Sequence, residues 1–105
     1  TAQEKNELQI GNTSINLTRD EVYVDGEKVV FSPKEVEILH LMAAHLNQVF
    51  TREQLLDSIW GFDFDGDSRV VDTSIKRIRK KLPEYSMLAV RSVYGVGYKI
   101  EAANA

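Results

Sequence analysis

The chain has 105 residues with a formal net charge of −3 and a pI near 5.3, and 43% of its residues are hydrophobic. This length suits one small domain with a single core, and the acidic balance argues against a protein that coats nucleic acid regardless of sequence. The absence of cysteine excludes disulfides and thiolate metal sites, and the lack of a signal peptide or of an apolar run near the ~20 residues of a membrane span indicates a cytoplasmic protein without membrane contact.

The N-terminal part of the chain predicts a small antiparallel sheet. Residues 1–7 are polar and without period, so we interpret them as the remnant of a linker and expect the chain to be a fragment of a longer protein. From Leu8 to Phe31, apolar and polar residues alternate as in half-buried strands. Asp25-Gly26 separates EVYV from EKVVF, and a two-residue type I′ turn requires two residues that tolerate positive φ.

Two capping boxes predict the starts of two helices. Ser32 is followed by Glu35 three residues later, with Pro33 at the first helical position. Thr51 and Gln54 repeat the pattern. In the first helix the expected apolar positions are Val36, Leu39, Ala43 and Leu46, and the helix is expected to end at Asn47. In the second helix they are Leu55, Leu56, Ile59 and Trp60, and Gly61 is the expected stop.

A third helix is predicted over RVVDTSIKRIRKKL, residues 69–82, and it is strongly basic. Val71, Ile75, Ile78 and Leu82 recur at the spacing of one helical stripe. Asp72 is the single acid against six basic residues, so this segment carries +5 and the remainder of the chain −8. Such charge separation indicates either a nucleic-acid footprint or a solvated helix face. The basic residues are Arg69, Lys76, Arg77, Arg79, Lys80 and Lys81.

The C-terminal part predicts a closing hairpin. Pro83 ends the basic helix, and LAVRSV and YKIE then flank YGVG, in which Gly95 and Gly97 permit a tight or irregular turn. The fold class is therefore α+β, a winged helix-turn-helix with an N-terminal antiparallel sheet, three helices and a C-terminal β-hairpin wing. In that architecture a basic helix enters the major groove and the wing reaches an adjacent groove or the backbone.

Four motifs carry a family resemblance: FSPKEVEIL, VFTREQLLDSIWG, RVVDTSIKRIRKKL and VRSVYGVGYKIE, in this order. With them, residues 8–101 resemble the effector domains of OmpR/PhoB-type response regulators, with residues 102–105 left as a tail. The resemblance implies sequence-specific binding to double-stranded promoter DNA by a regulator of a two-component system. It also implies a receiver domain upstream in the parent chain and head-to-tail dimers on direct repeats.

The resemblance implies roles for residues of the basic helix. It places Thr73 and Arg77, one turn apart, against bases, and the fork of Arg77 matches guanine O6 and N7. Three further residues are expected to meet phosphates, which position the protein without specifying sequence: Arg69, Lys76 and Lys80. Arg79 lies closer to the buried stripe and is a candidate for pairing with an acidic side chain instead.

Outside that helix, the resemblance places Arg52 and Trp60 against the DNA backbone, although core packing is an equal alternative for Trp60. Ser92 either meets a phosphate or lies on the surface of a strand. Tyr94 departs from the family, because many members carry an arginine there that enters the minor groove. An uncharged tyrosine is not drawn by the negative potential of that groove, so it stacks on sugar, bonds phosphate or lies on the wing. Arg91 is a possible substitute.

The loop between the second and third helices is acidic and aromatic. The resemblance implies that it contacts RNA polymerase, and a merely solvated loop is the alternative. Asp63, Asp65 and Asp67 have the spacing of a calcium-loop start, but Ser74 occupies the twelfth position where an EF-hand needs Glu, so no metal site is predicted. The residues of the loop are Phe62, Asp63, Phe64, Asp65, Gly66 and Asp67.

The sequence does not predict an enzyme or a cofactor. His40 and His45 are five residues apart, not the four of a helical metal pair, and no nucleophile and base are suggested by spacing. No glycine-rich phosphate loop opens a helix. The alternative to DNA binding is a winged-helix module for protein interaction, in which the basic helix meets an acidic partner.

Overall fold

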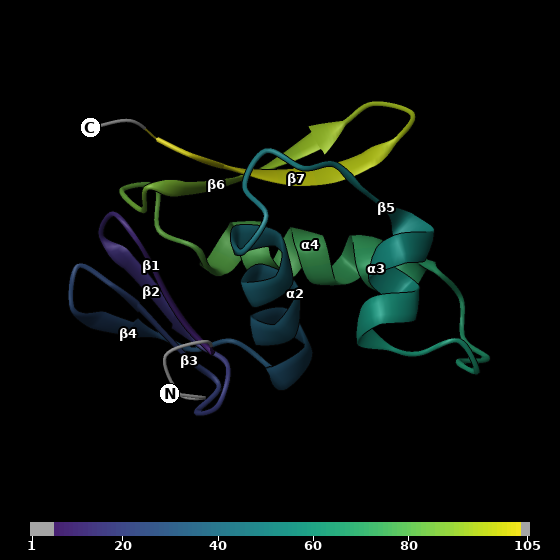
Figure 1. Cartoon of the computed structure of the whole chain (residues 1–105), viewed down its shortest axis with the longest axis horizontal. Coiled ribbons are helices and arrows are strands. Elements are labelled where there is room, and N and C mark those ends of the chain that lie inside the picture. Colours follow the sequence, from purple (N-terminus) through teal and green to yellow (C-terminus); the bar gives the residue numbers. More distant parts are fainter. Residues whose placement is uncertain (1–5, 104–105) are drawn as a thin grey trace.

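The computed structural model describes residues 6–103 and contains two antiparallel sheets separated by three helices. The first sheet has the order β1 (Glu7–Ile10), β2 (Thr13–Asn16), β3 (Glu21–Val24), β4 (Glu27–Val29). The helices are α2 (Pro33–Ala43), α3 (Arg52–Ile59) and α4 (Arg69–Lys81). In the second sheet, β7 (Gly97–Ala102) lies between β5 (Phe50–Thr51) and β6 (Leu88–Val93). Helix α2 lies at the centre, with the first sheet on one side and the β6–β7 hairpin above it (Figure 1).

Most of the expected linker remnant, residues 1–7, and half of the expected tail, residues 102–105, lie outside the described residues. Within them, β1 begins at Glu7 and β7 ends at Ala102, so both segments contribute one residue to a strand. None of the three helices in residues 6–103 is long and apolar enough to cross a membrane.

The local signals of the sequence are found where they were predicted. Ser32 accepts a hydrogen bond from the Glu35 N–H at 3.3 Å, and the Glu35 carboxylate accepts one from the Ser32 N–H at 2.8 Å. Thr51 and Gln54 form the second capping box in the same way. In the turn between β3 and β4, both Asp25 and Gly26 have positive φ, at 52° and 80°. The two helix starts and the hairpin turn are therefore confirmed.

The predicted end of α2 at Asn47 was wrong, because the helix ends at Ala43. Residues after Ala43 tighten into shorter turns, with the His45 N–H donating to the Met42 carbonyl. Asn47 instead adopts φ of 69° and donates its N–H to the carbonyl of Ile100 in β7, at 2.8 Å. The predicted stop after α3 is confirmed, since Gly61 follows the C-cap with φ of 99°.

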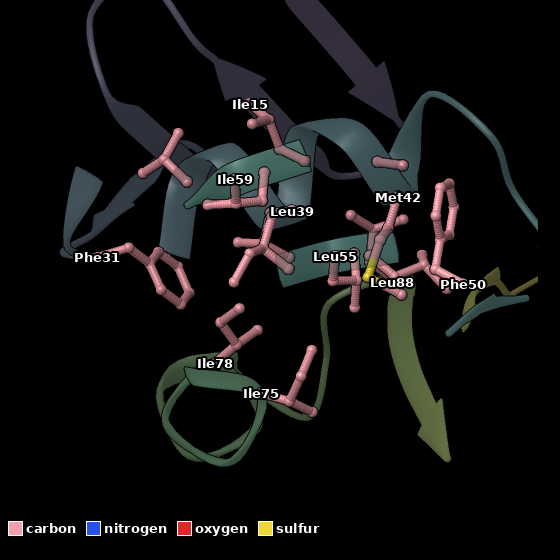
Figure 2. Close-up of a cluster of buried hydrophobic side chains, with 14 of the residues drawn as sticks. Ile15, Phe31, Leu39, Met42, Phe50, Leu55, Ile59, Ile75, Ile78 and Leu88 are labelled. Atoms are coloured by element: carbon pink, nitrogen blue, oxygen red, sulfur yellow. The ribbon is translucent and has the colours of Figure 1, made fainter. Parts of the chain in front are cut away.

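The core forms where the three helices meet the two sheets. Val71, Ile75 and Ile78 of α4 are fully buried, as the stripe predicted. Figure 2 shows Ile75 and Ile78 pointing from α4 toward Leu39 of α2, with Leu55 and Ile59 of α3 nearby. Burial of this stripe fixes which face of α4 is turned to solvent.

The short strand β5 was not predicted, and it changes the interpretation of Gly97. Thr51 of β5 lies opposite Gly97 of β7, and a Cβ atom on Gly97 would lie 2.0 Å from the Phe50 carbonyl oxygen. Gly97 is therefore required for close approach of two strands, not for the turn as predicted. Gly95, with φ of 77°, makes the turn of the wing.

Candidate nucleic-acid interface

Helix α4 carries a polar stripe directly opposite its buried one. At 100° per residue, Thr73, Lys76, Arg77 and Lys80 project to the side away from Val71, Ile75 and Ile78, and the structure leaves all four exposed. Within residues 6–103, no ion pair involves Lys76, Arg77 or Lys80. The stripe therefore presents three cations that form no ion pair with the part of the chain described by the structure. We call Arg69, Thr73, Lys76, Arg77 and Lys80 the outer stripe.

On one flank of α4, Asp72 connects this helix to α3 and to the wing. Its carboxylate pairs with the Arg52 guanidinium, with Nη2 to Oδ2 at 3.0 Å, and accepts a hydrogen bond from the Tyr98 hydroxyl at 2.5 Å. Burial, the hydrogen bond to this carboxylate and its charge raise the pKa of Tyr98. A hollow of about 430 Å³, lined by Arg52, Asp72 and the wing residues 92–98, adjoins this contact. One carboxylate thus joins three elements at the edge of the hollow.

The predicted acidic partner of Arg79 was wrong. Arg79 donates from Nη2 to the Ser92 hydroxyl at 2.6 Å and from Nε to the Val90 carbonyl at 3.2 Å, both in β6. Its guanidinium lies 5.8 Å from the centre of the Tyr98 ring. The flank of α4 that carries Arg79 faces the hairpin, which offers hydroxyl, carbonyl and aromatic groups but no acid to this side chain. In this contact the Ser92 hydroxyl oxygen is the acceptor.

Trp60, the C-cap residue of α3, lies beside the opposite flank of α4. It is half-buried and packs against the core. Its ring lies 6.3 Å from that of Phe64, and the Lys34 ammonium is 5.9 Å from its centre. Core packing of Trp60, one of the two alternatives drawn from the sequence, is therefore present, and part of the indole also reaches the surface. A second hollow, of about 490 Å³, is lined here by Trp60, Arg69, Arg77 and their neighbours.

Arg69, at the start of α4, is held by Asp67 of the preceding loop. Arg69 Nη2 and Nε lie 2.8 and 2.9 Å from Asp67 Oδ2, while Asp67 Oδ1 accepts the main-chain N–H of Arg69 at 2.9 Å. These hydrogen bonds lower the pKa of Asp67, and the side-chain bond raises the pKa of Arg69. Ser68, in the N-cap position, makes no side-chain capping bond, so Asp67 satisfies an exposed amide of α4 in its place.

The wing tip and the loop both expose aromatic side chains. Tyr94 is fully exposed at the turn of the hairpin, and Val96 near it is half exposed. The four residues between Val93 and Tyr98 include no charged side chain. In the loop, Phe62 is 89% exposed, whereas Phe64 turns back onto Trp60. The loop is therefore partly fastened to α3 and not uniformly solvated.

Sequence reasoning missed three residues that shape this surface. The hydrogen bond between Tyr98 and Asp72 joins the wing to α4. Lys81 forms an ion pair with Glu35 of α2 and is not a freely solvated side chain. The available signal was angular: Asp72 and Arg79 lie about 90° from the buried stripe, and Lys81 lies on the other flank. Residues at those angles face neighbouring elements, so their partners depend on which element packs there.

The fold and this surface define a winged helix-turn-helix protein, in which α4 is the exposed basic helix and the β6–β7 hairpin is the wing. Residues 26–100 match the model of the family described as transcriptional regulatory protein, C terminal. The chain belongs to this family, and it is a DNA-binding effector domain of the OmpR/PhoB class of two-component response regulators. The predicted fold class and the family resemblance are thereby confirmed.

Relatives of known structure and function agree. The heme response regulator HssR of Staphylococcus aureus is 41% identical over 96 residues, which cover 90% of this chain and 43% of that protein. The response regulator DrrB of Thermotoga maritima, an OmpR/PhoB homologue, superposes with a TM-score of 0.77 at 34% identity over 92% of this chain and 45% of that one. The RstA DNA-binding domain of Klebsiella pneumoniae, in complex with the RstA box, gives 0.77 at 30% identity over 90% and 96%. The chain thus spans less than half the length of the curated relatives it matches.

Proposed function

We propose that this domain binds promoter DNA sequence-specifically by placing α4 in the major groove. The observation that carries the proposal is the outer stripe, which presents, opposite the buried stripe, three cations that form no ion pair within residues 6–103. The major groove of B-DNA, about 12 Å wide, admits one helix, and attraction to phosphates supplies a large share of the affinity of such a contact. The solved complex of the RstA DNA-binding domain with the RstA box supports DNA binding by a domain of this fold.

We propose a role for each of the candidate residues on this surface, in line with the family resemblance. Arg77, exposed and unpaired at the middle of the stripe, reads a base edge, and Thr73 one turn before it contacts a thymine methyl. Lys76, Lys80 and Arg69 meet phosphates. Backbone contacts continue on both flanks of α4 with the remaining candidates: Arg52, Trp60 and Ser92.

For the parent protein we propose an upstream receiver domain, head-to-tail dimers on direct repeats and action in the bacterial cytoplasm, where promoter DNA is found. The loop of residues 62–67 is the proposed contact for RNA polymerase. Its exposed Phe62 and its carboxylates suit a partner that is basic and partly apolar.

Selection of duplex DNA from a random pool by the 105-residue chain, followed by sequencing, tests the proposal. We expect one enriched motif with a repeat in direct orientation, and loss of preference at one position of the motif with Arg77→Ala. No enrichment by a chain that is folded by circular dichroism would contradict sequence-specific binding. A partner protein retained after nuclease treatment would then favour the protein-interaction alternative.

A further inference from the structure

We propose that Asp67 competes with DNA phosphate for Arg69, so that the loop before α4 limits how strongly the outer stripe holds DNA. This inference rests on the proposed function, because it concerns one of the phosphate contacts assigned there. It adds to that function a residue that opposes binding.

The ion pair occupies the face of Arg69 that a phosphate requires. Arginine binds carboxylate and phosphate with the same fork of donors, and in this structure Nε and Nη2 are both directed at Asp67 Oδ2. A phosphate oxygen can take the position of Oδ2 without a change in the number of hydrogen bonds. Carboxylate and phosphate are therefore alternatives at this guanidinium.

Because the Arg69–Asp67 ion pair is exposed, replacement of the carboxylate by phosphate should cost little free energy. The Arg69 side chain is 81% exposed and that of Asp67 is 55% exposed, and exposed ion pairs of this kind contribute little net stability. The other carboxylate at this surface is different, because Asp72 is 28% exposed and is also held by Tyr98. Asp72 fixes the wing, whereas Asp67 is the carboxylate whose partner can leave.

Asp67 opposes DNA binding in two ways. It holds Arg69 in the free domain, and after exchange its charge remains beside the incoming phosphate, because its Oδ1 accepts the main-chain N–H of Arg69. Of the five residues in the outer stripe, Arg69 alone pairs with a carboxylate within residues 6–103. Removal of one negative charge at Asp67 should therefore increase affinity more than the same removal elsewhere in the loop.

The matched pair of variants is Asp67→Asn and Asp65→Asn, which remove one charge each from the same exposed loop. Asn at position 67 keeps an oxygen for the Arg69 N–H, so the cap of α4 is retained. With a mixed-sequence duplex as the probe at low salt, we expect Asp67→Asn to bind about three- to fivefold more tightly than Asp65→Asn. In an Arg69→Ala background, the difference between the two variants should become clearly smaller, because only the effect of the Asp67 charge, which stays bonded to the main-chain N–H of residue 69, then remains.

Equal affinities of the two single variants would overturn the proposal, and so would a difference that persists in full without Arg69. Asp67→Ser, which supplies an uncharged cap, must reproduce the increase, and this variant guards against an effect of Asn on folding. Because the probe carries no selected site, this comparison does not depend on base readout. Failure of the proposed function would appear separately, as equal binding of selected and mixed sequences by the wild-type chain.

Discussion

The ammonium group of Lys81 lies 2.6 Å from Oε1 of Glu35 and joins the last turn of α4 to the first turn of α2. The Glu35 side chain is 3% exposed, and the same oxygen accepts the Ser32 N–H of the capping box. Burial alone would raise the pKa of Glu35, but the hydrogen bonds from Lys81 and Ser32 and the charge of Lys81 outweigh it, and the pKa is lowered. This contact links the end of α4 to α2 and directs Lys81 away from the outer stripe.

Stability should therefore fall in acid through Glu35. Because its folded-state pKa is below the ordinary value of 4.5, its contribution is fully present above about pH 4.5 and is lost as pH falls through the lower folded value. Urea unfolding at a series of pH values should show a smaller acid loss for Glu35→Gln than for the wild-type chain. Glu37→Gln, at a more exposed ion pair, is the control, and an unchanged acid slope in Glu35→Gln would contradict this assignment.

Arg77→Ala should weaken binding to the selected motif by about 1–3 kcal/mol and relax the preference at one base position. The expected reason is the loss of the proposed bidentate contact between the exposed Arg77 guanidinium and a base edge. Titration against the motif and against its single-base variants measures both effects. A uniform loss across all variants would reassign Arg77 to a phosphate contact.

Lys80→Ala should act differently, because we propose that Lys80 contacts a phosphate and not a base edge. We expect weaker binding to every sequence and a salt slope, log K against log salt, that is smaller by about one unit. Titration at several salt concentrations provides the slope. Lys81→Ala is the matched control, since Lys81 is one residue away but faces Glu35, and its slope should stay at the wild-type value.

Tyr94→Arg tests whether the wing tip lies near DNA. Tyr94 is fully exposed, so arginine can replace it without disturbing packing. A tip close to the duplex should then gain affinity and a steeper salt slope by about one unit, with a preference for A·T pairs where the minor groove is narrow. An affinity and slope equal to those of the wild-type chain would place the tip away from DNA.

Gly97→Ala should separate β5 from β7. The added Cβ would collide with the main-chain carbonyl of Phe50, which cannot rotate away as a side chain would. We expect loss of stability in urea and weaker hydrogen-exchange protection in the wing. Gly95→Ala is a useful comparison, because its Cβ meets nothing within 4 Å, although its φ of 77° still carries strain. Equal stability of Gly97→Ala and the wild-type chain would refute the close-approach argument.

The sequence predicted what depends on residues close in the chain. The capping boxes at Ser32 and Thr51 and the turn at Asp25-Gly26 were correct because their hydrogen bonds and φ angles are local. The buried stripe of α4 followed from helical period alone. The features that the sequence did not predict involve contacts between distant segments. Strand β5 has only two residues, too few for a periodic signal, and Asn47, which follows α2, bonds to Ile100 of β7.

The same distinction applies to the candidate site. The exposed stripe was predicted by its angle, since residues opposite a buried face meet solvent. The partners of residues on the flanks of α4 were not predicted. Arg79 contacts Ser92 because of where the hairpin packs, and Arg52 pairs with Asp72 because of where α3 packs. Charge composition treated all six basic residues of the helix alike, whereas the structure assigns Lys81 to Glu35 and Arg69 to Asp67.

Strand β5 has a consequence for how such a domain diversifies. Thr51 is both the last residue of β5 and the N-cap of α3, and β5 pairs with β7 through the main chain. The angle between the hairpin and the helices is thereby held largely without the tip residues, provided that Gly97 is kept. Tyr94 and Val96 can then be exchanged for other side chains while the frame that presents them stays in place, so the chemistry of the tip can change without redesign of the domain around it.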